Sequence, residues 1–285
     1  MKVTFYGTRG SLATPGRSTQ RYGGNTSCVL VRGEDGSAIV LDAGTGIRAA
    51  GGDLPRDLRR VDVLLTHLHM DHIQGLGFFG PLYNPGVEVH IWGPASATLA
   101  LDARLSRYLS PPLFPVLLRD LPCRLHLHHV PCNEAEIGPF RMVAQGVCHP
   151  GPTVGYRLAE GGAVLTYIPD HEPALGARNF PEEPEWTSGW DLAHKADLLV
   201  HDAQYTREEY SSHVGWGHSS LQDSLAFAAL AGVGHLVFFH HDPARDDEAL
   251  GAASQAAVTE ARPSFSVTPA AEGDSFVLPA SSAGT

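Results

Sequence analysis

The densest group of potential metal ligands in the sequence is residues 66–72, Thr-His-Leu-His-Met-Asp-His, which directly follow an apolar run. Imidazole nitrogens and carboxylate oxygens are the ligands that zinc and similar divalent ions accept. Alternation along an extended chain lets His67 and His69 face one way, and a turn then lets Asp71 and His72 face a second ion. The stretch therefore predicts a metal site rather than a polar loop that is rich in histidine.

Three later segments also place metal-binding residue types at the end of an expected strand. They are residues 148–151 with His149, 167–171 with Asp170, and 238–242 with His240 and His241. Each segment alone is weak, because a single histidine at a strand end is more often an ordinary hydrogen-bonded residue. Together with residues 66–72 they supply enough ligands for two ions. The two neighbouring histidines of the last segment cannot be separated by sequence, so both stay candidates.

The elements that would carry these residues are mostly strands, because short apolar, β-branched runs alternate with turn-rich stretches. Expected strands cover residues 2–6, 27–32, 38–42, 61–66, 87–92, 124–130, 140–147, 154–159, 163–168, 198–201, 236–239 and about 275–278. Expected helices cover residues 95–109, 71–77, 219–231 with an N-cap at Ser219 or Ser220, and 246–262. This order predicts an α/β fold in which two sheets are sandwiched between helices, as one domain over residues 1–278. Residues 279–285 are small and polar, which predicts a disordered tail.

The charge balance limits the size of the substrate. The 285 residues include 31 acidic and 20 basic side chains, a formal net charge of −11. A protein that holds a long nucleic acid on its general surface needs a basic face. A pair of metal ions can still attract a small anion, so we expect a small anionic substrate and no large nucleic acid.

The sequence also predicts a cytoplasmic protein with no membrane partner. Residues 1–7 enter a strand-like run without the apolar core of a signal peptide, and no apolar run is long enough to span a bilayer. The four cysteines have no CxxC spacing, which is typical of reduced thiols, although a disulfide between Cys123 and Cys132 stays open.

Taken together, these motifs resemble the metallo-β-lactamase superfamily over nearly the whole chain. The motif His67-x-His69-x-Asp71-His72 is the defining motif of that superfamily. The resemblance implies a four-layer αββα sandwich and two divalent ions, with zinc expected and manganese or iron as alternatives. It also implies the ligands: His67, His69 and His149 for one ion; Asp71, His72 and His240 (or His241) for the other; Asp170 between both.

Further segments resemble ribonuclease Z and cyclic-nucleotide phosphodiesterase-like members of the superfamily. They are residues 7–11, 22–27, 41–46, 201–204 and 217–220. The second motif position is His69, whereas diiron oxidoreductases have glutamate there, so hydrolysis is favoured over redox chemistry. The chain lacks an insertion resembling the glycine-rich, basic arm with which ribonuclease Z grips tRNA. We therefore expect a small phosphodiester, a cyclic nucleotide or a short RNA, as substrate, and the resemblance also suggests a homodimer.

Phosphodiester hydrolysis would assign a role to each polar residue. A hydroxide bridging the two ions would attack phosphorus, with Asp71 orienting it as well as binding an ion. His218 is the candidate general acid for the departing alkoxide, with His201 or an adjacent carboxylate orienting it. Either histidine could instead be a structural hydrogen-bonding residue. Asp42 would hydrogen-bond a ligand histidine, and Arg9 could contact a phosphate or lie on the surface.

Other functions share the main motif. A thioesterase of the glyoxalase II kind, or a lactonase, is the main alternative, and a non-catalytic metal-binding signalling module is a further one. Residues 124–129 hold three histidines but no acid and match no superfamily motif, so we expect them to alternate along a strand with two facing solvent.

Overall fold

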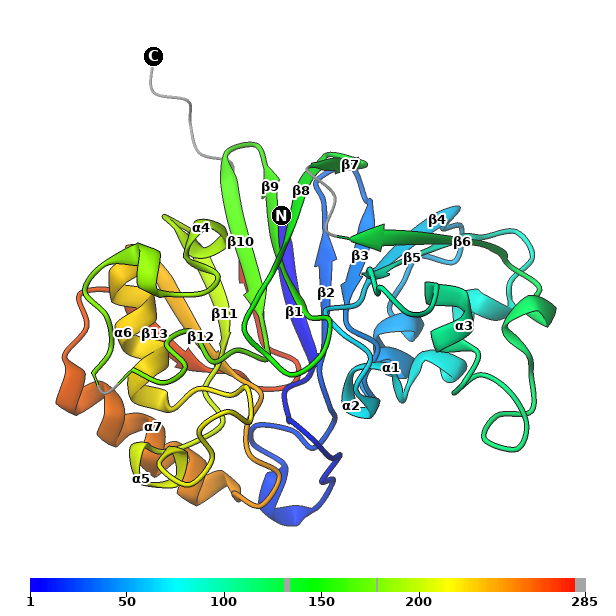
Figure 1. The fold of residues 1–285 in the computed structure, drawn as a ribbon. Helices are drawn as coiled ribbons and strands as arrows, with labels where there is room; N and C mark the ends of the chain where they lie inside the picture. The colour runs from blue at the N-terminus through cyan, green and yellow to red at the C-terminus, as the bar shows by residue number, and fades with distance from the viewer. Residues whose placement is uncertain (131–133, 178, 280–285) are drawn as a thin grey trace.

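The structure is a computed structural model that describes residues 1–130, 134–177 and 179–279. Two seven-stranded sheets face each other, and helices cover their outer faces, so the predicted αββα sandwich is confirmed (Figure 1). In order across the first sheet the strands are β14 (Ser275–Val277), β1 (Lys2–Gly7), β2 (Cys28–Arg32), β3 (Ala38–Leu41), β4 (Arg60–Leu64), β5 (Glu88–Pro94) and β6 (Arg124–Val130). In order across the second they are β13 (Ser266–Pro269), β12 (His235–Phe239), β11 (Leu198–Asp202), β10 (Ala163–Ile168), β9 (Val154–Glu160), β8 (Phe140–Gly146) and β7 (Ala135–Ile137).

Parallel pairing brings several strand ends to one edge of each sheet. Strands β3 to β6 run parallel to one another, and so do β10 to β13. Strand β8 also runs in the direction of β10, because both are antiparallel to β9. Residues that follow β3, β4, β8, β10, β11 and β12 are therefore brought to the same side of the sandwich.

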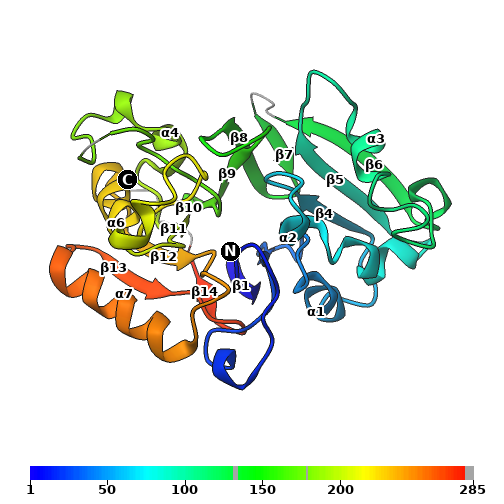
Figure 2. The same cartoon turned by 60° about the horizontal axis from the view of Figure 1, so that its bottom comes forward.

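Helices pack on the outer face of each sheet (Figures 1 and 2). On the first sheet they are α1 (Ile47–Gly52) and α3 (Leu101–Leu105), with short 3-10 turns between them, while α2 (Met70–Ile73) lies in the segment that follows β4. On the second sheet they are α4 (Trp190–Ala193), α6 (Leu221–Ala231) and α7 (Asp247–Ala261), while α5 (Arg207–Tyr210) lies in the segment between β11 and α6. Between the two sheets, alternate residues of the strands form a shared apolar core, in which Phe5 of β1 lies 5.9 Å from Phe239 of β12, centroid to centroid.

Helix α6 begins and ends at the capping residues that the sequence predicts. The Ser220 side chain accepts a hydrogen bond from the amide of Asp223 at the start of α6, and Gly232 ends that helix at φ 66°. The expected helix 95–109 was wrong in extent, since only Leu101–Leu105 is helical. Ser96 accepts a hydrogen bond from the amide of Thr98, and such local side-chain contacts compete with helix formation.

Other expectations concern single residues or the ends of the chain. Among the described residues, no helix has the length and apolarity to cross a membrane. Cys28, Cys123 and Cys148 are free thiols, whereas Cys132 lies outside the described residues. So does the predicted tail from residue 280 onward.

Candidate two-metal site

A cluster of histidines and aspartates lies where strands from both sheets end. Residues 66–72 follow β4, and α2 begins immediately within them, with His69 as its N-cap residue. His149 follows β8, Asp170 follows β10 and His240 follows β12. The structure therefore brings together side chains that are far apart in the sequence.

These side chains form two groups of three. In the first group, one donor atom each from His67, His69 and His149 lies within 4.8 Å of the others. In the second group, Asp71, His72 and His240 meet the same criterion. A group of this size, with donors of this kind, matches the ligand number that catalytic zinc sites take from the protein.

Asp170 lies between the two groups and turns one carboxylate oxygen toward each. Its Oδ1 is 3.0 Å from Nε2 of His72 and 3.3 Å from Nε2 of His240. Its Oδ2 is 3.7 Å from Nε2 of both His67 and His149. The carboxylate is thus in position to contact an ion in either group.

Four of the imidazole rings are anchored through Nδ1. The partners are the Thr66 hydroxyl for His67 at 3.1 Å, Asp42 for His72 at 2.8 Å, the Gly217 carbonyl for His149 at 2.8 Å and the Gln204 side chain for His240 at 3.0 Å. Anchoring of one nitrogen fixes the ring orientation and leaves Nε2 as the nitrogen that faces the cluster.

The donor set fits divalent ions. His67 Nε2 is buried and has no hydrogen-bond partner, although the ring is fully surrounded by protein. Burial, reinforced by the neighbouring His72, holds the pKa of His67 well below its ordinary value, so its lone pair is free. Buried polar atoms almost always have a partner, and a metal ion would supply this one.

The structure separates His240 from His241. The ring of His241 turns away from the cluster, its Nε2 lies 2.9 Å from the carbonyl oxygen of Ala270, and it packs against Tyr22. His240 Nε2 lies 3.2 Å from Asp71 Oδ2. Of the two candidates, only His240 is in position to be a ligand.

Asp42 connects the two sheets beneath the cluster. Its carboxylate accepts hydrogen bonds from the amide and hydroxyl of Thr66, from His72 and from the hydroxyl of Tyr167 on β10. The predicted hydrogen bond from Asp42 to a ligand-type histidine is confirmed. Asp42 has φ 59°, a left-handed conformation that aspartate and asparagine tolerate better than most residues.

His218 lies beside the cluster in the loop before α6. Its Nδ1 is 2.7 Å from Oδ2 of Asp202, and its ring stacks on that of His240 at 4.9 Å. Burial alone would lower the pKa of His218, but the charge and hydrogen bond of Asp202 outweigh it and raise the pKa to about 9. The ring lies next to the two groups, and its raised pKa favours the protonated form at neutral pH.

The prediction that His201 orients His218 is wrong. Its Nδ1 lies 2.9 Å from the Ser224 hydroxyl, its Nε2 lies 2.9 Å from His171, and its ring stacks on Phe227. Alternation along β11 turns His201 toward α6, and burial lowers its pKa to about 4. Asp202, the adjacent carboxylate, faces His218 instead.

Arg9 is also structural. It is fully buried, and its guanidinium donates to the backbone carbonyls of Gly23, Asp242 and Arg245. Both expected alternatives for Arg9, a phosphate contact and a position on the surface, are therefore wrong. Its hydrogen bonds fix the loop that follows His240 against the amino-terminal loop.

Glu172 is a functional residue that the sequence did not reveal. Its carboxylate accepts hydrogen bonds from the amides of Gly215 and Gly217 and from the hydroxyl of Tyr210. These contacts hold the loop that carries His218. The only signal in the sequence is the position of Glu172 two residues after Asp170.

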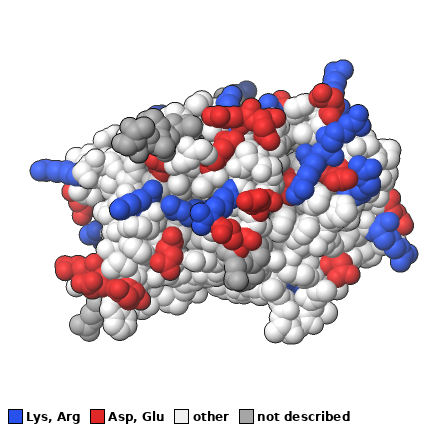
Figure 3. All heavy atoms as spheres, turned by 90° about the horizontal axis from the view of Figure 1, so that it is seen from above, with Lys and Arg blue, Asp and Glu red and all other residues white. Residues whose placement is uncertain are grey.

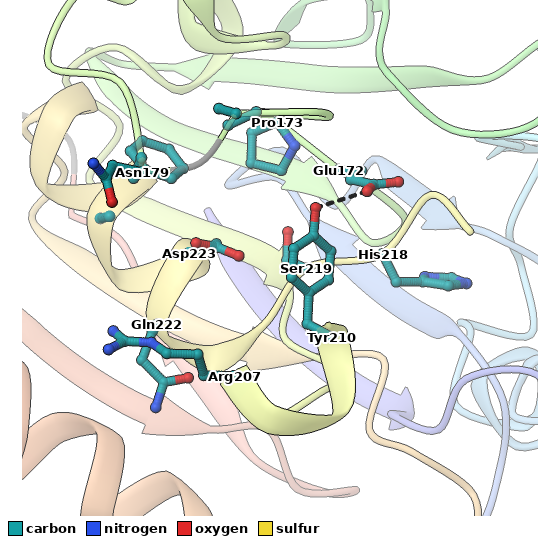
Figure 4. A pocket seen from close by; sticks show the side chains of 13 residues that line it. Glu172, Pro173, Asn179, Arg207, Tyr210, His218, Ser219, Gln222 and Asp223 are labelled. Carbon is teal, nitrogen blue, oxygen red and sulfur yellow. Dashed lines mark hydrogen bonds between the residues drawn. The ribbon is translucent and has the colours of Figure 1, made fainter. Parts of the chain in front are cut away.

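Two cavities flank the cluster. One, of about 340 Å³, lies beside His218 and is bounded by Glu172, Tyr210 and Asp223 (Figure 4). The other, of about 380 Å³, lies beside His67 and His69 and is bounded mainly by apolar side chains, among them Leu68, Ile73, Tyr108 and Leu113. The second cavity borders the cluster directly, whereas the first borders only His218, whose imidazole points away from it in Figure 4.

Comparison with known proteins agrees with this architecture. Residues 37–241 match the family described as the β-lactamase superfamily domain. Ribonuclease Z of Bradyrhizobium diazoefficiens is 28% identical over 87% of this chain and 92% of its own length. The short form of human tRNase Z has a TM-score of 0.69 at 22% identity, covering 98% of this chain and 100% of its own. A diphosphatase of the PhnP family has a TM-score of 0.69 at 18% identity, covering 98% of each chain. Because the family match spans more than half of its residues, the chain belongs to the β-lactamase superfamily.

Proposed function

We propose that this metal-dependent hydrolase cleaves a small phosphodiester, such as a cyclic nucleotide or a short RNA. The observation that carries the proposal is the Asp202–His218 pair, which places a protonated imidazole beside the two ligand groups. The names of the relatives support the reaction class, since ribonuclease Z and a diphosphatase both act on phosphate linkages. A metal site without a proton donor would suit substrates whose leaving group needs no protonation.

The two groups of side chains would each hold one ion. His67, His69 and His149 would bind the first, Asp71, His72 and His240 the second, and Asp170 would contact both. Zinc suits these donors best, with manganese or iron as alternatives. Two divalent ions so held would lower the pKa of water and neutralise charge on the phosphate oxygens.

His218 would give its proton to the oxygen of the leaving alkoxide. Its raised pKa keeps it protonated at neutral pH, and Asp202 orients the ring so that Nε2 is free to donate. The leaving group must then lie on the side of His218.

The charge of the protein supports a small substrate. The net charge is −11. Acidic and basic side chains are also intermingled on the face shown in Figure 3, which is the end of the sandwich opposite the cluster. A cytoplasmic location and a homodimer stay predictions.

A thioesterase or lactonase is the second candidate, and the apolar cavity favours it. That cavity lies against His67 and His69 and would accept an acyl chain or the body of a lactone. The Asp202–His218 pair favours the phosphodiester over a thioester, because a thiolate leaves without help from an acid.

The proposal is tested with protein reconstituted with Zn²⁺ or Mn²⁺, assayed on bis(p-nitrophenyl) phosphate beside a thioester and a lactone. We expect phosphodiester turnover that is lost in Asp71→Ala and kept in Asp120→Ala, a matched change of an exposed acid. Activity confined to the thioester or lactone would contradict the phosphodiester. Two bound ions without turnover on any substrate would favour the metal-binding signalling module.

A further inference from the structure

A second group of histidines lies on the first sheet, away from the two-metal site. His90 of β5 is paired in register with His126 of β6, and Trp92 with His128. The four rings form one stack, with centroid distances of 4.5 Å for His126–His90, 5.1 Å for His90–His128 and 4.0 Å for His128–Trp92. Alternate residues of a strand share a face, so the four side chains lie on the face that includes Leu64 of β4.

Glu88 completes a set of three possible ligands. It begins β5, two residues before His90, and therefore lies on the same face. One donor atom each from Glu88, His90 and His126 lies within 4.8 Å of the others. Ligand atoms around a tetrahedral zinc ion are about 3.3 Å apart, so small rotations of the partly exposed Glu88 and the exposed His126 would close the set.

The clearest indication of a bound ligand is a buried nitrogen of His90 that has no hydrogen-bond partner. His90 is buried, and its Nδ1 lies 2.9 Å from Nε2 of His128. Its other nitrogen, Nε2, is buried without a hydrogen-bond partner and lies 3.7 Å from Oε2 of Glu88. If Nδ1 of His90 donates to His128, the lone pair of His90 is on Nε2, as is usual for a histidine that binds a metal.

Two carboxylates and two arginines surround the set, and Arg60 is paired with Asp62 at 2.8 Å. Burial lowers the pKa of both His90 and His128, so both rings are neutral near pH 7. Arg124 pairs with Oε1 of Glu88 at 3.0 Å, which leaves Oε2 on the side of His90. Asp62 of β4 faces the same side and accepts a hydrogen bond from Nε1 of Trp92 at 2.8 Å.

We propose that Glu88, His90 and His126 form a separate site for a divalent transition-metal ion such as Zn²⁺ or Ni²⁺. Two imidazoles and one carboxylate suit these ions and not Mg²⁺ or Ca²⁺, which prefer oxygen. The site lies at the amino-terminal part of β5 and β6, the opposite end of these strands from the edge that carries His67 and His69. An ion bound there would join β6, the outermost strand of its sheet, to β5.

The first test counts bound ions. Wild-type protein, His126→Ala and the control His129→Ala are dialysed against micromolar Zn²⁺, and zinc per chain is measured by plasma mass spectrometry. His129 is exposed on the same strand but on the opposite face. We expect His126→Ala to bind one ion fewer than wild type, and His129→Ala to match wild type. Equal counts in all three would overturn the proposal.

The count does not depend on the proposed function, because it is a difference between proteins that share the same two-metal site.

A second test uses unaltered protein and needs no variant to fold. Diethyl pyrocarbonate modifies exposed imidazoles, and tandem mass spectrometry of the peptide that follows Arg124 locates each modified ring. We expect Zn²⁺ to slow modification of His126 several-fold and to leave His129 unchanged. Equal rates for His126 with and without Zn²⁺ would overturn the site.

Discussion

His218 Nδ1 lies 2.7 Å from Asp202 Oδ2, and this contact joins the loop before α6 to the end of β11. The same carboxylate is fixed by the backbone amides of His171 and Ser219, so it has little freedom to turn away. A fixed negative charge at this distance explains why the pKa of His218 rises to about 9 in spite of burial.

The first prediction concerns pH. A proton donor with a raised pKa is active below that pKa and is lost as pH rises through it, so we expect kcat for phosphodiester cleavage to fall on the alkaline side. Replacing Asp202 with Asn removes the charge that raises the pKa of His218, so the fall should move to lower pH. The measurement is kcat against pH for wild type and Asp202→Asn on a phenyl phosphodiester. A fall at the same pH in both proteins would show that another group titrates.

The second prediction concerns the leaving group. Phenolate is a poorer leaving group than p-nitrophenolate and needs the proton more, so His218→Gln should slow the phenyl ester more than the p-nitrophenyl ester. Loss of a general acid typically costs about 10²- to 10⁴-fold. Single-turnover rates on both esters would measure the difference. An equal loss on the two esters would assign His218 to substrate binding rather than proton transfer.

The third prediction concerns Asp42. Asp42→Asn keeps a residue that tolerates φ 59° but exchanges one acceptor oxygen for an NH₂ group, which faces hydrogen-bond donors. Each buried donor left unpaired costs about 1–3 kcal/mol, and loss of a carboxylate behind a ligand typically weakens metal binding about 10- to 100-fold. Urea unfolding and competition with a chelator would measure both effects. Tyr167→Phe, which removes one hydrogen bond and no charge, should lose stability but little metal affinity.

The fourth prediction concerns Gly10. A Cβ at this position would lie 2.3 Å from Nδ1 of His240, so Gly10→Ala should push the imidazole away and weaken the second ligand group. Gly52→Ala is the matched control, because its Cβ meets nothing within 4 Å, and it should stabilise the protein by about 0.4–1 kcal/mol. Metal content and thermal unfolding distinguish the two. Retention of full metal content by Gly10→Ala would show that His240 is not needed.

The ligand groups could be predicted because their residue types are rare and the strand ends bring them together. His67, His149, Asp170 and His240 each follow an apolar run, and such runs are readable from local sequence. The partners behind them are not readable, because Gln204 and Gly217 contact rings that are distant in the sequence. The orientation of His201 could not be predicted for the same reason. The side chain of a histidine at a strand end can lie on either face of the sheet, and here it packs against Ser224 and Phe227 of α6.

The positions of most strands could also be predicted from the sequence. Strands with long apolar runs were placed within a few residues, whereas the short outer strands β7 and β13 have no such run and depend on their neighbours for pairing. Residues 124–129 contain three histidines but no acidic residue, so the sequence did not predict a metal site there. The acid, Glu88, comes from the neighbouring strand β5, which only the register of the parallel pair places opposite.

Because His240 follows β12, the second ligand group is completed late in the synthesis of the chain. Synthesis delivers residues 66–72 early, together with β4, and delivers β12 only after most of the chain has left the ribosome. Asp71 and His72 are therefore joined by His240 only after β12 has paired with β11. An ion held by all three residues of the second group would therefore bind only after most of the chain has been made.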